Sequence, residues 1–152
     1  ERAFKSPMLC DVTKVHTGNG FMPKVTHCTD DQNWGTIGGS RKIFMKKNLF
    51  FKGGEAALDT VLERKENEYW KIEISNFKYW VYGFTKFEGE WFTSQKSDGS
   101  IQIKYIYSLY SKNRLAYPFH WFIAKIIWKN YMKHVIQNIQ NFIKNKEPYL
   151  HQ

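Results

Sequence analysis

The sequence predicts one α+β domain, residues 1–152, in which a curved antiparallel sheet of about six or seven strands wraps around a long C-terminal helix. The length of 152 residues fits a single domain. Between residues 40 and 110, apolar and polar side chains alternate with a period close to two, which is typical of strands with one buried face. From Pro118 to Lys146 the period becomes helical.

The composition indicates an interior rich in aromatic rings. Trp, Tyr and Phe make up 18% of the chain, and the apolar share of 42% excludes a disordered chain. Because each ring buries a large area, we expect either a very aromatic core or a cavity lined with rings. The two cysteines, Cys10 and Cys28, exclude a disulfide-rich scaffold, and their spacing leaves open whether they are reduced.

The formal net charge of +9 raises the question of an anionic partner. The basic residues are mostly lysines spread through amphipathic segments, without a run of four or more. We therefore expect a solvated lysine face and no nucleic-acid partner. No C-x-x-C or H-x-x-x-H spacing is present, so we expect neither a metal nor a cofactor.

The N-terminal segment is predicted to contain short elements. Arg2 to Lys5 is interpreted as the end of a first strand, and Pro7 to His16 as a short helix or two turns. Pro23 to Thr29 is a plausible short strand. Gly35 to Gly39 lacks the Lys-Ser/Thr pair of a phosphate-binding loop, so we expect a turn or a flexible element at the mouth of a cavity.

Two long strands, Ser40 to Lys52 and Glu55 to Glu66, are predicted to form a hairpin around Gly53-Gly54. The alternation in the second strand predicts one apolar and one solvated face. Its predicted interior face consists of Ala56, Leu58, Thr60 and Leu62, opposite Glu55, Asp59 and Glu63.

Three further strands are predicted over 70–75, Trp80 to Thr93, and Ile101 to Tyr110. Ser97 to Ser100 has the composition of a tight turn between the last two. The predicted interior face of the last strand consists of Ile101, Ile103, Tyr105, Tyr107 and Leu109.

The long C-terminal helix is predicted over 118–146, with a length of roughly 40 Å at 1.5 Å per residue. Its predicted apolar side consists of Trp121, Ala124, Ile127, Trp128, Tyr131, Val135, Ile139 and Phe142. Phe122 and Ile126 fall on the lysine side, so they are either covered by a loop or form a small contact patch.

The order of elements, together with several short motifs, resembles the helix-grip (SRPBCC) superfamily. That superfamily includes birch-pollen-allergen-like proteins, START-related lipid-transfer domains and polyketide cyclase/dehydrase-like proteins, and the resemblance is greatest with its uncharacterised bacterial branch. The matching segments, which together cover nearly the whole chain, are Gly20 to Pro23, Trp34 to Arg41, Gly89 to Phe92, Tyr105 to Tyr107, and Trp128 to Met132. The sequence departs from the family pattern in its short N-terminal strand.

The resemblance implies a large cavity between the concave face of the sheet and the long helix. The predicted faces agree, because a curved sheet and a straight helix need not touch along their whole length. The predicted cavity residues are Arg41, Ile43, Met45, Leu58, Trp70, Ile72, Phe87, Trp91, Ile103, Tyr105, Tyr107, Trp128, Tyr131 and Val135.

Four candidate polar roles remain open. Arg41 shares a face with Ile43 and Met45, so its guanidinium either orients a ligand carboxylate or carbonyl, or forms an internal ion pair, or lies at the cavity rim. The hydroxyls of Tyr105, Tyr107 and Tyr131 either polarise a ligand carbonyl, or serve as general acids, or bond to the backbone within an aromatic core.

Glu88 and Glu90 share a strand face, which suits acid/base chemistry if they are buried, but Lys86 on the same face favours cross-strand ion pairs. The histidines, without a recognisable nucleophile motif, are expected to have structural or surface roles.

Our leading hypothesis is non-catalytic binding of a hydrophobic or amphipathic small molecule, such as a lipid or a polyketide-like or aromatic metabolite, in this cavity. The first alternative is a polyketide cyclase/dehydratase-like enzyme that uses the same cavity. The second is a protein-interaction domain that acts through the lysine-rich helix or the patch of Phe122 and Ile126.

We expect a cytoplasmic protein. No charged segment precedes an apolar stretch, so no signal peptide is visible. Lys125, Lys129 and Lys133 interrupt the longest helical apolar stretch, which excludes an integral membrane segment. The identity of the ligand and the oligomeric state do not follow from the sequence.

Overall fold

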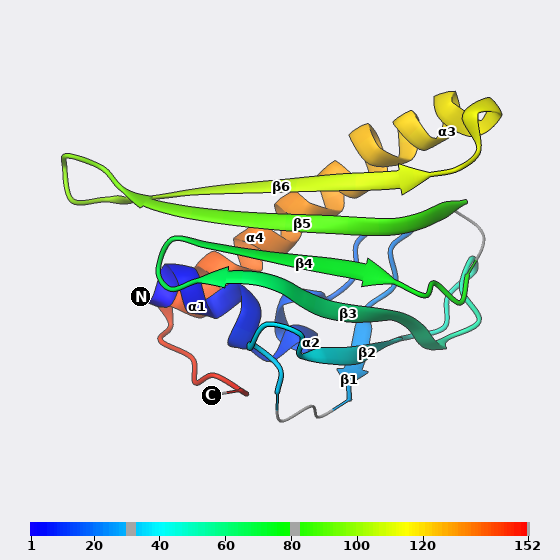
Figure 1. Cartoon of the computed structure of the whole chain (residues 1–152). Helices are drawn as coiled ribbons and strands as arrows, with labels where there is room; N and C mark the ends of the chain where they lie inside the picture. The colour runs from blue at the N-terminus through cyan, green and yellow to red at the C-terminus, as the bar shows by residue number, and fades with distance from the viewer. Residues whose placement is uncertain (30–32, 80–82, 152) are drawn as a thin grey trace.

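The computed structural model describes residues 1–29, 33–79 and 83–151, and its described residues form one antiparallel sheet and a long helix that lies across one face of it (Figure 1). The strands are β1 (Val25–Cys28), β2 (Ser40–Met45), β3 (Gly54–Lys65), β4 (Tyr69–Ser75), β5 (Phe84–Gln95) and β6 (Ile101–Ser111). They pair in chain order from β1 to β6. The predicted fold class is confirmed, with six strands in the part of the chain described.

The chain begins with helices, so the predicted strand over Arg2 to Lys5 is wrong. Helix α1 (Arg2–Leu9) and the short helix α2 (Val12–Val15) precede β1. Phe4 and Met8 lie one helical turn apart and are both buried, so α1 presents one apolar face to the core. A segment of four residues is too short for its sequence to distinguish the alternation of a strand from a turn of helix.

The hairpin between β2 and β3 forms as expected, but β2 ends at Met45 instead of Lys52. The Asn48 side chain accepts hydrogen bonds from the backbone N–H groups of Phe50 and Phe51, which folds the connection into a compact loop. Gly53 closes this loop with a φ of 81°, and a Cβ there would meet the backbone of Lys47 at 2.9 Å.

Ala56 is buried as predicted, but from Ala57 to Val61 the interior face of β3 is opposite to the predicted one. Ala57, Asp59 and Val61 are buried, whereas Leu58 is half-buried on the other face. The register explains the difference, because Asp59 lies directly opposite Arg41 of β2 and therefore shares its face. The prediction placed every carboxylate of this strand on the solvated face, so it missed a buried aspartate that pairs with a buried arginine.

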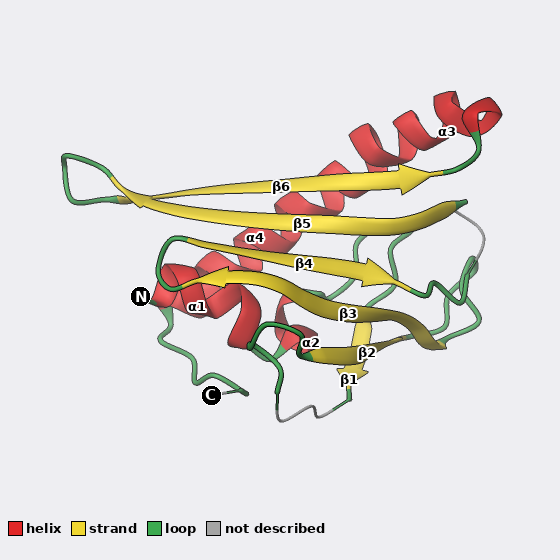
Figure 2. Cartoon of the chain, viewed as in Figure 1, coloured by secondary structure: helices red, strands yellow, loops and turns green. Residues whose placement is uncertain are grey.

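The C-terminal helix crosses the sheet diagonally (Figure 2) and is continuous from α3 (Tyr117–Phe122) through the π-helical segment η3 (Ile123–Trp128) to α4 (Lys129–Lys144). A short 3₁₀ turn, η2 (Arg114–Ala116), leads into it and is capped by the side chain of Asn113. The helix predicted over 118–146 therefore agrees closely in extent with the observed helix.

The π-helical segment changes which side chains of the helix are buried. Within α4 the predicted residues Tyr131, Val135 and Ile139 are buried. Upstream of η3, His120 is buried and the predicted Trp121 is 50% exposed, and Ile123, the first residue of η3, is buried. The wider π turn holds more residues than an α turn, so the apolar stripe shifts by one position on its N-terminal side. Phe122 and Ile126 are both exposed, so they are not covered by a loop, and a contact patch stays a prediction.

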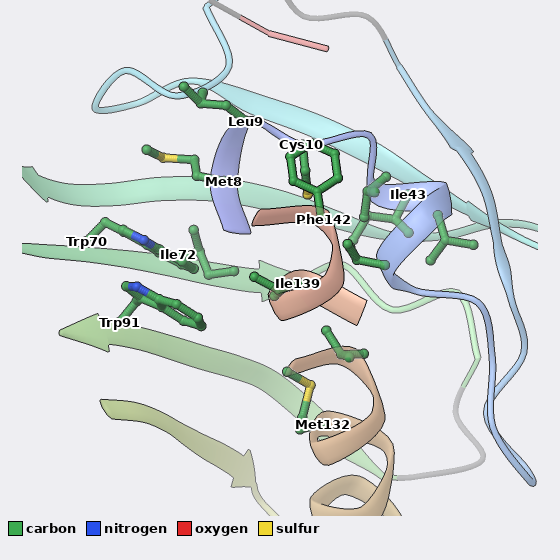
Figure 3. Packing of buried hydrophobic residues seen from close by; sticks show 14 of the residues in the cluster. Met8, Leu9, Cys10, Ile43, Trp70, Ile72, Trp91, Met132, Ile139 and Phe142 are labelled. Atoms are coloured by element: carbon green, nitrogen blue, oxygen red, sulfur yellow. The ribbon is translucent and has the colours of Figure 1, made fainter. Parts of the chain in front are cut away.

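The core joins α1, the sheet and α4 (Figure 3). Trp70 and Trp91 stack with parallel rings whose centroids are 5.8 Å apart, and both are almost completely buried. Met132, Ile139 and Phe142 of α4 and Met8 of α1 belong to the same buried cluster. This cluster fixes the helix against one end of the sheet.

Replacing Ile139 with alanine is expected to lower the free energy of unfolding by about 2–4 kcal/mol, because Ile139 is 3% exposed and its loss leaves a cavity. Ile126, on the same helix and 44% exposed, provides the matched control: Ile126→Ala is expected to change the value by less than about 0.5 kcal/mol. Urea denaturation followed by circular dichroism measures both. Equal losses for the two variants would contradict the packing described here.

Candidate functional site

A cavity of about 110 Å³ lies between the concave face of the sheet and the long helix. Its lining is mostly apolar and includes aromatic rings from several strands and from the π-helical segment. The lining residues that were not predicted are Pro7, Met8, Val12, His16, Met22, Val25, Trp34, Phe51, Ala56, Ala57, Asp59, Ile74, Phe77, Tyr79, Ile123 and Ile127. A volume of this order resembles that of an engineered cavity of roughly 150 Å³ that takes up benzene.

Most of the predicted cavity residues surround this space. Those that line it are Arg41, Ile43, Met45, Trp70, Ile72, Phe87, Tyr105, Tyr107, Trp128 and Tyr131. Four others lie elsewhere. Trp91 and Val135 are fully buried in the core, Ile103 packs against that core, and Leu58 lies on the opposite face of β3. Trp91 contacts the rings of Trp70 and Tyr105, which line the cavity, but does not itself line it.

Arg41 and Asp59 form a buried ion pair on the sheet side of the cavity. The Nε and Nη2 atoms of Arg41 donate to Oδ2 of Asp59 at 3.4 and 3.3 Å, and each side chain is 5% exposed. The guanidinium lies 3.6 Å from the ring centroid of Trp34. Burial raises the pKa of Asp59 to about 6, although the charge of Arg41 acts in the opposite direction. Of the alternatives for Arg41, the internal ion pair is present.

Tyr105 and Tyr107 place two hydroxyls beside the same cavity. The Tyr105 hydroxyl donates to that of Tyr107 at 2.9 Å, instead of bonding to the backbone. Gly89 makes room for them, because a Cβ there would come within 3.0 Å of the Tyr107 ring. Desolvation raises the pKa of both phenols, so they remain protonated and can donate hydrogen bonds.

His16 and Tyr131 form a second polar pair, which the sequence did not reveal. Nδ1 of His16 lies 2.7 Å from the Tyr131 hydroxyl. Desolvation, and to a lesser degree the charge of Arg41, lowers the pKa of His16 to about 4, so the ring is neutral near pH 7. His16 follows α2 directly, and no motif marks it; only the packing of α2 against α4 brings it to the cavity.

Glu88 belongs to an ion-pair network away from the cavity. Lys86 lies 2.6 Å from Glu88 and 3.1 Å from Glu73 on the neighbouring strand, and the Tyr110 hydroxyl also donates to Glu88. The hydrogen bond from Lys86 is the main cause that lowers the pKa of Glu88 to about 2. Tyr69 donates to Glu90 at 3.0 Å. Cross-strand ion pairs, and not a catalytic carboxylate pair, therefore explain this motif.

The remaining candidates are the cysteines. Cys10 and Cys28 are both free thiols, and burial raises their pKa values to about 12 and about 11.

Over the ranges 1–29, 33–79 and 83–151, no three His, Cys, Asp or Glu side chains come together in a way that could hold a metal ion. None of the helices described is both long and apolar enough to cross a membrane.

A six-stranded antiparallel sheet that curves over a long C-terminal helix, with a cavity between them, defines the helix-grip, Bet v 1-like fold. A crystal structure of Ara h 8.0201, a Bet v 1-like allergen, shares this fold with a TM-score of 0.57 and 14% sequence identity. The similarity covers 92% of this chain and 88% of that one. A scan against models of protein families finds no match, and neither does a sequence search of curated proteins.

The buried His16 ring is expected to make stability depend on pH. The unfolded histidine takes up a proton near pH 6.5, whereas the folded one resists protonation down to about pH 4. Acidification through this window therefore favours the unfolded chain, by on the order of 2 kcal/mol for this half-buried group.

Relative to His16→Gln, the wild type should lose stability as the pH falls from 6.5 to 4. Urea denaturation at a series of pH values measures this difference, with the exposed His27→Gln as the matched control. A difference that does not vary with pH would show that the His16 ring is protonated as easily in the folded chain as in the unfolded one.

Proposed function

We propose that this protein binds a hydrophobic or amphipathic small molecule in the cavity between sheet and helix, without catalysing a reaction. The observation that carries the proposal is an apolar, ring-lined cavity into which a few buried polar side chains converge. Such a combination is the usual composition of a small-molecule site. The Bet v 1-like fold is a fold that binds hydrophobic ligands, which supports the same proposal.

The cavity volume favours an aromatic or short apolar group as the part of the ligand that is buried. An aromatic ring that buries roughly 150–250 Å² gains about 4–6 kcal/mol at about 25 cal/mol per Å², before the cost of association. Trp70, Phe87 and Trp128 offer ring faces and edges to such a group. Longer ligands would need the lining to move apart.

The polar groups of the cavity suit orientation of a ligand better than catalysis. Among the described lining residues, Asp59 and His16 are the two side chains able to accept a proton, and each is already bonded to a neighbour. The tyrosine phenols are held in the neutral form. A cyclase or dehydratase reaction would require one of these groups to leave its partner first.

Native mass spectrometry of the freshly purified protein is the direct test for a ligand acquired in the cell. We expect a mass excess that disappears after denaturation and that extracts as an apolar compound. Repeated preparations without such an excess, combined with failure of the protein to bind any neutral aromatic probe, would overturn the proposal.

Filling the cavity is expected to abolish binding of an apolar probe. Ala57 is 3% exposed and lines the cavity, so Ala57→Leu should weaken binding of α-methylstyrene, a neutral aromatic hydrocarbon, by at least about tenfold. Ala3→Leu introduces the same change on α1, outside the lining, and should leave the affinity within about twofold. Titrations followed by protein NMR chemical shifts measure both. Equal affinities for the two variants would place the probe outside this cavity.

A further inference from the structure

The ion pair that borders the cavity leaves one donor and one acceptor without partners. Both side-chain nitrogens of Arg41 that face Asp59, Nε and Nη2, donate to the same oxygen, Oδ2. The remaining atoms, Nη1 of Arg41 and Oδ1 of Asp59, are buried and have no hydrogen-bond partner among the described residues. Both residues line the cavity.

Two such atoms on adjacent buried groups are unusual, because an unpaired polar group inside a protein lowers its stability. The pair is held in place by the register of β2 and β3 and by the ring of Trp34, which covers the guanidinium. The N–H groups of Nη1 lie in the plane of the guanidinium, as in every arginine. The site therefore presents one unpaired donor and one unpaired acceptor on two neighbouring side chains that border the cavity.

We propose that Arg41 and Asp59 form a subsite for a neutral ligand group that carries both a hydrogen-bond acceptor and a hydrogen-bond donor, of which a primary carboxamide is the simplest case. This inference rests on the proposed function, because it names the polar group of the ligand that the cavity binds. The ligand carbonyl accepts from Nη1 of Arg41, and the ligand N–H donates to Oδ1 of Asp59.

The charge of the pair selects against other ligand groups. A carboxylate would bond to Arg41 but would meet the negative charge of Asp59, and an ammonium would meet the positive charge of Arg41. A purely apolar group would leave both free atoms unpaired. A ketone would satisfy Arg41 alone, so the full complement requires a donor and an acceptor side by side.

Three probes of almost the same shape and with the same number of heavy atoms separate these cases: benzamide has both groups, acetophenone has the carbonyl alone, and α-methylstyrene has neither. Benzoate serves as the anionic probe. Titrations at about pH 8, where the carboxyl of Asp59 is ionised, are followed by NMR chemical shifts of the full chain. The measured quantity is the ratio of the benzamide affinity to the α-methylstyrene affinity.

This ratio is compared with that of the double variant Arg41→Met/Asp59→Leu. Leucine has the same branched skeleton as aspartate, and a buried ion pair is often replaced by apolar residues of similar size without loss of stability. We expect the ratio to fall by about tenfold or more in the variant, because the variant cannot form the two hydrogen bonds to benzamide. The aqueous solvation of the probes is the same for both proteins, so it cancels in this comparison. An unchanged ratio would overturn the subsite.

The wild type alone decides the matter if the double variant does not fold. Acetophenone or benzoate binding as tightly as benzamide would show that no donor–acceptor pair is recognised, and the subsite would be wrong while cavity binding stands. If none of the four probes binds, the subsite is wrong, and the proposed function fails with it when native mass spectrometry also finds no carried ligand. Benzamide binding that exceeds both acetophenone and benzoate supports the inference.

Discussion

The buried pair of Arg41 and Asp59 determines which faces of β2 and β3 turn toward the helix. Two charges can leave water together only if they share a face and lie within hydrogen-bond reach, so the pair fixes the register of the two strands. A shift of β3 by one residue relative to β2 would turn Asp59 outward, leave Arg41 buried without its partner, and bring Leu58 into the interior. The apolar lining beside the pair, including Ile43 and Ala57, follows from the same register.

The sheet and the long helix pack closely near the C-terminal end of the helix, and the cavity lies between them toward its N-terminal end. The stacked rings of Trp70 and Trp91 and the side chains of α4 fill the space near Ile139. Toward the start of the helix, the π-helical turn places Ile123 and Ile127 on the cavity wall instead of packing them into the sheet. A regular α-helix would present Trp121 on this side.

Sequence periodicity was sufficient for the order of the strands, the hairpin at Gly53 and the extent of the long helix. It failed where a side chain is placed by a distant partner. Asp59 faces inward only because of Arg41, and His16 reaches the cavity only because α2 packs on α4. Trp121 was misplaced because the prediction used a uniform α-helical period, which a π turn interrupts. The positions of Asp59 and His16 are consequences of three-dimensional contacts that no local pattern contains.

The two buried titratable groups of the cavity oppose each other in their dependence on pH. The raised pKa of Asp59 makes protonation easier in the folded chain, so its contribution to stability is lost as the pH rises from about 4 to about 6. The lowered pKa of His16 has the reverse effect, and its contribution is lost as the pH falls from 6.5 to about 4. Because the two windows overlap, the losses partly offset each other. The fold can therefore keep both polar groups inside an apolar cavity without a steep change in stability over this range.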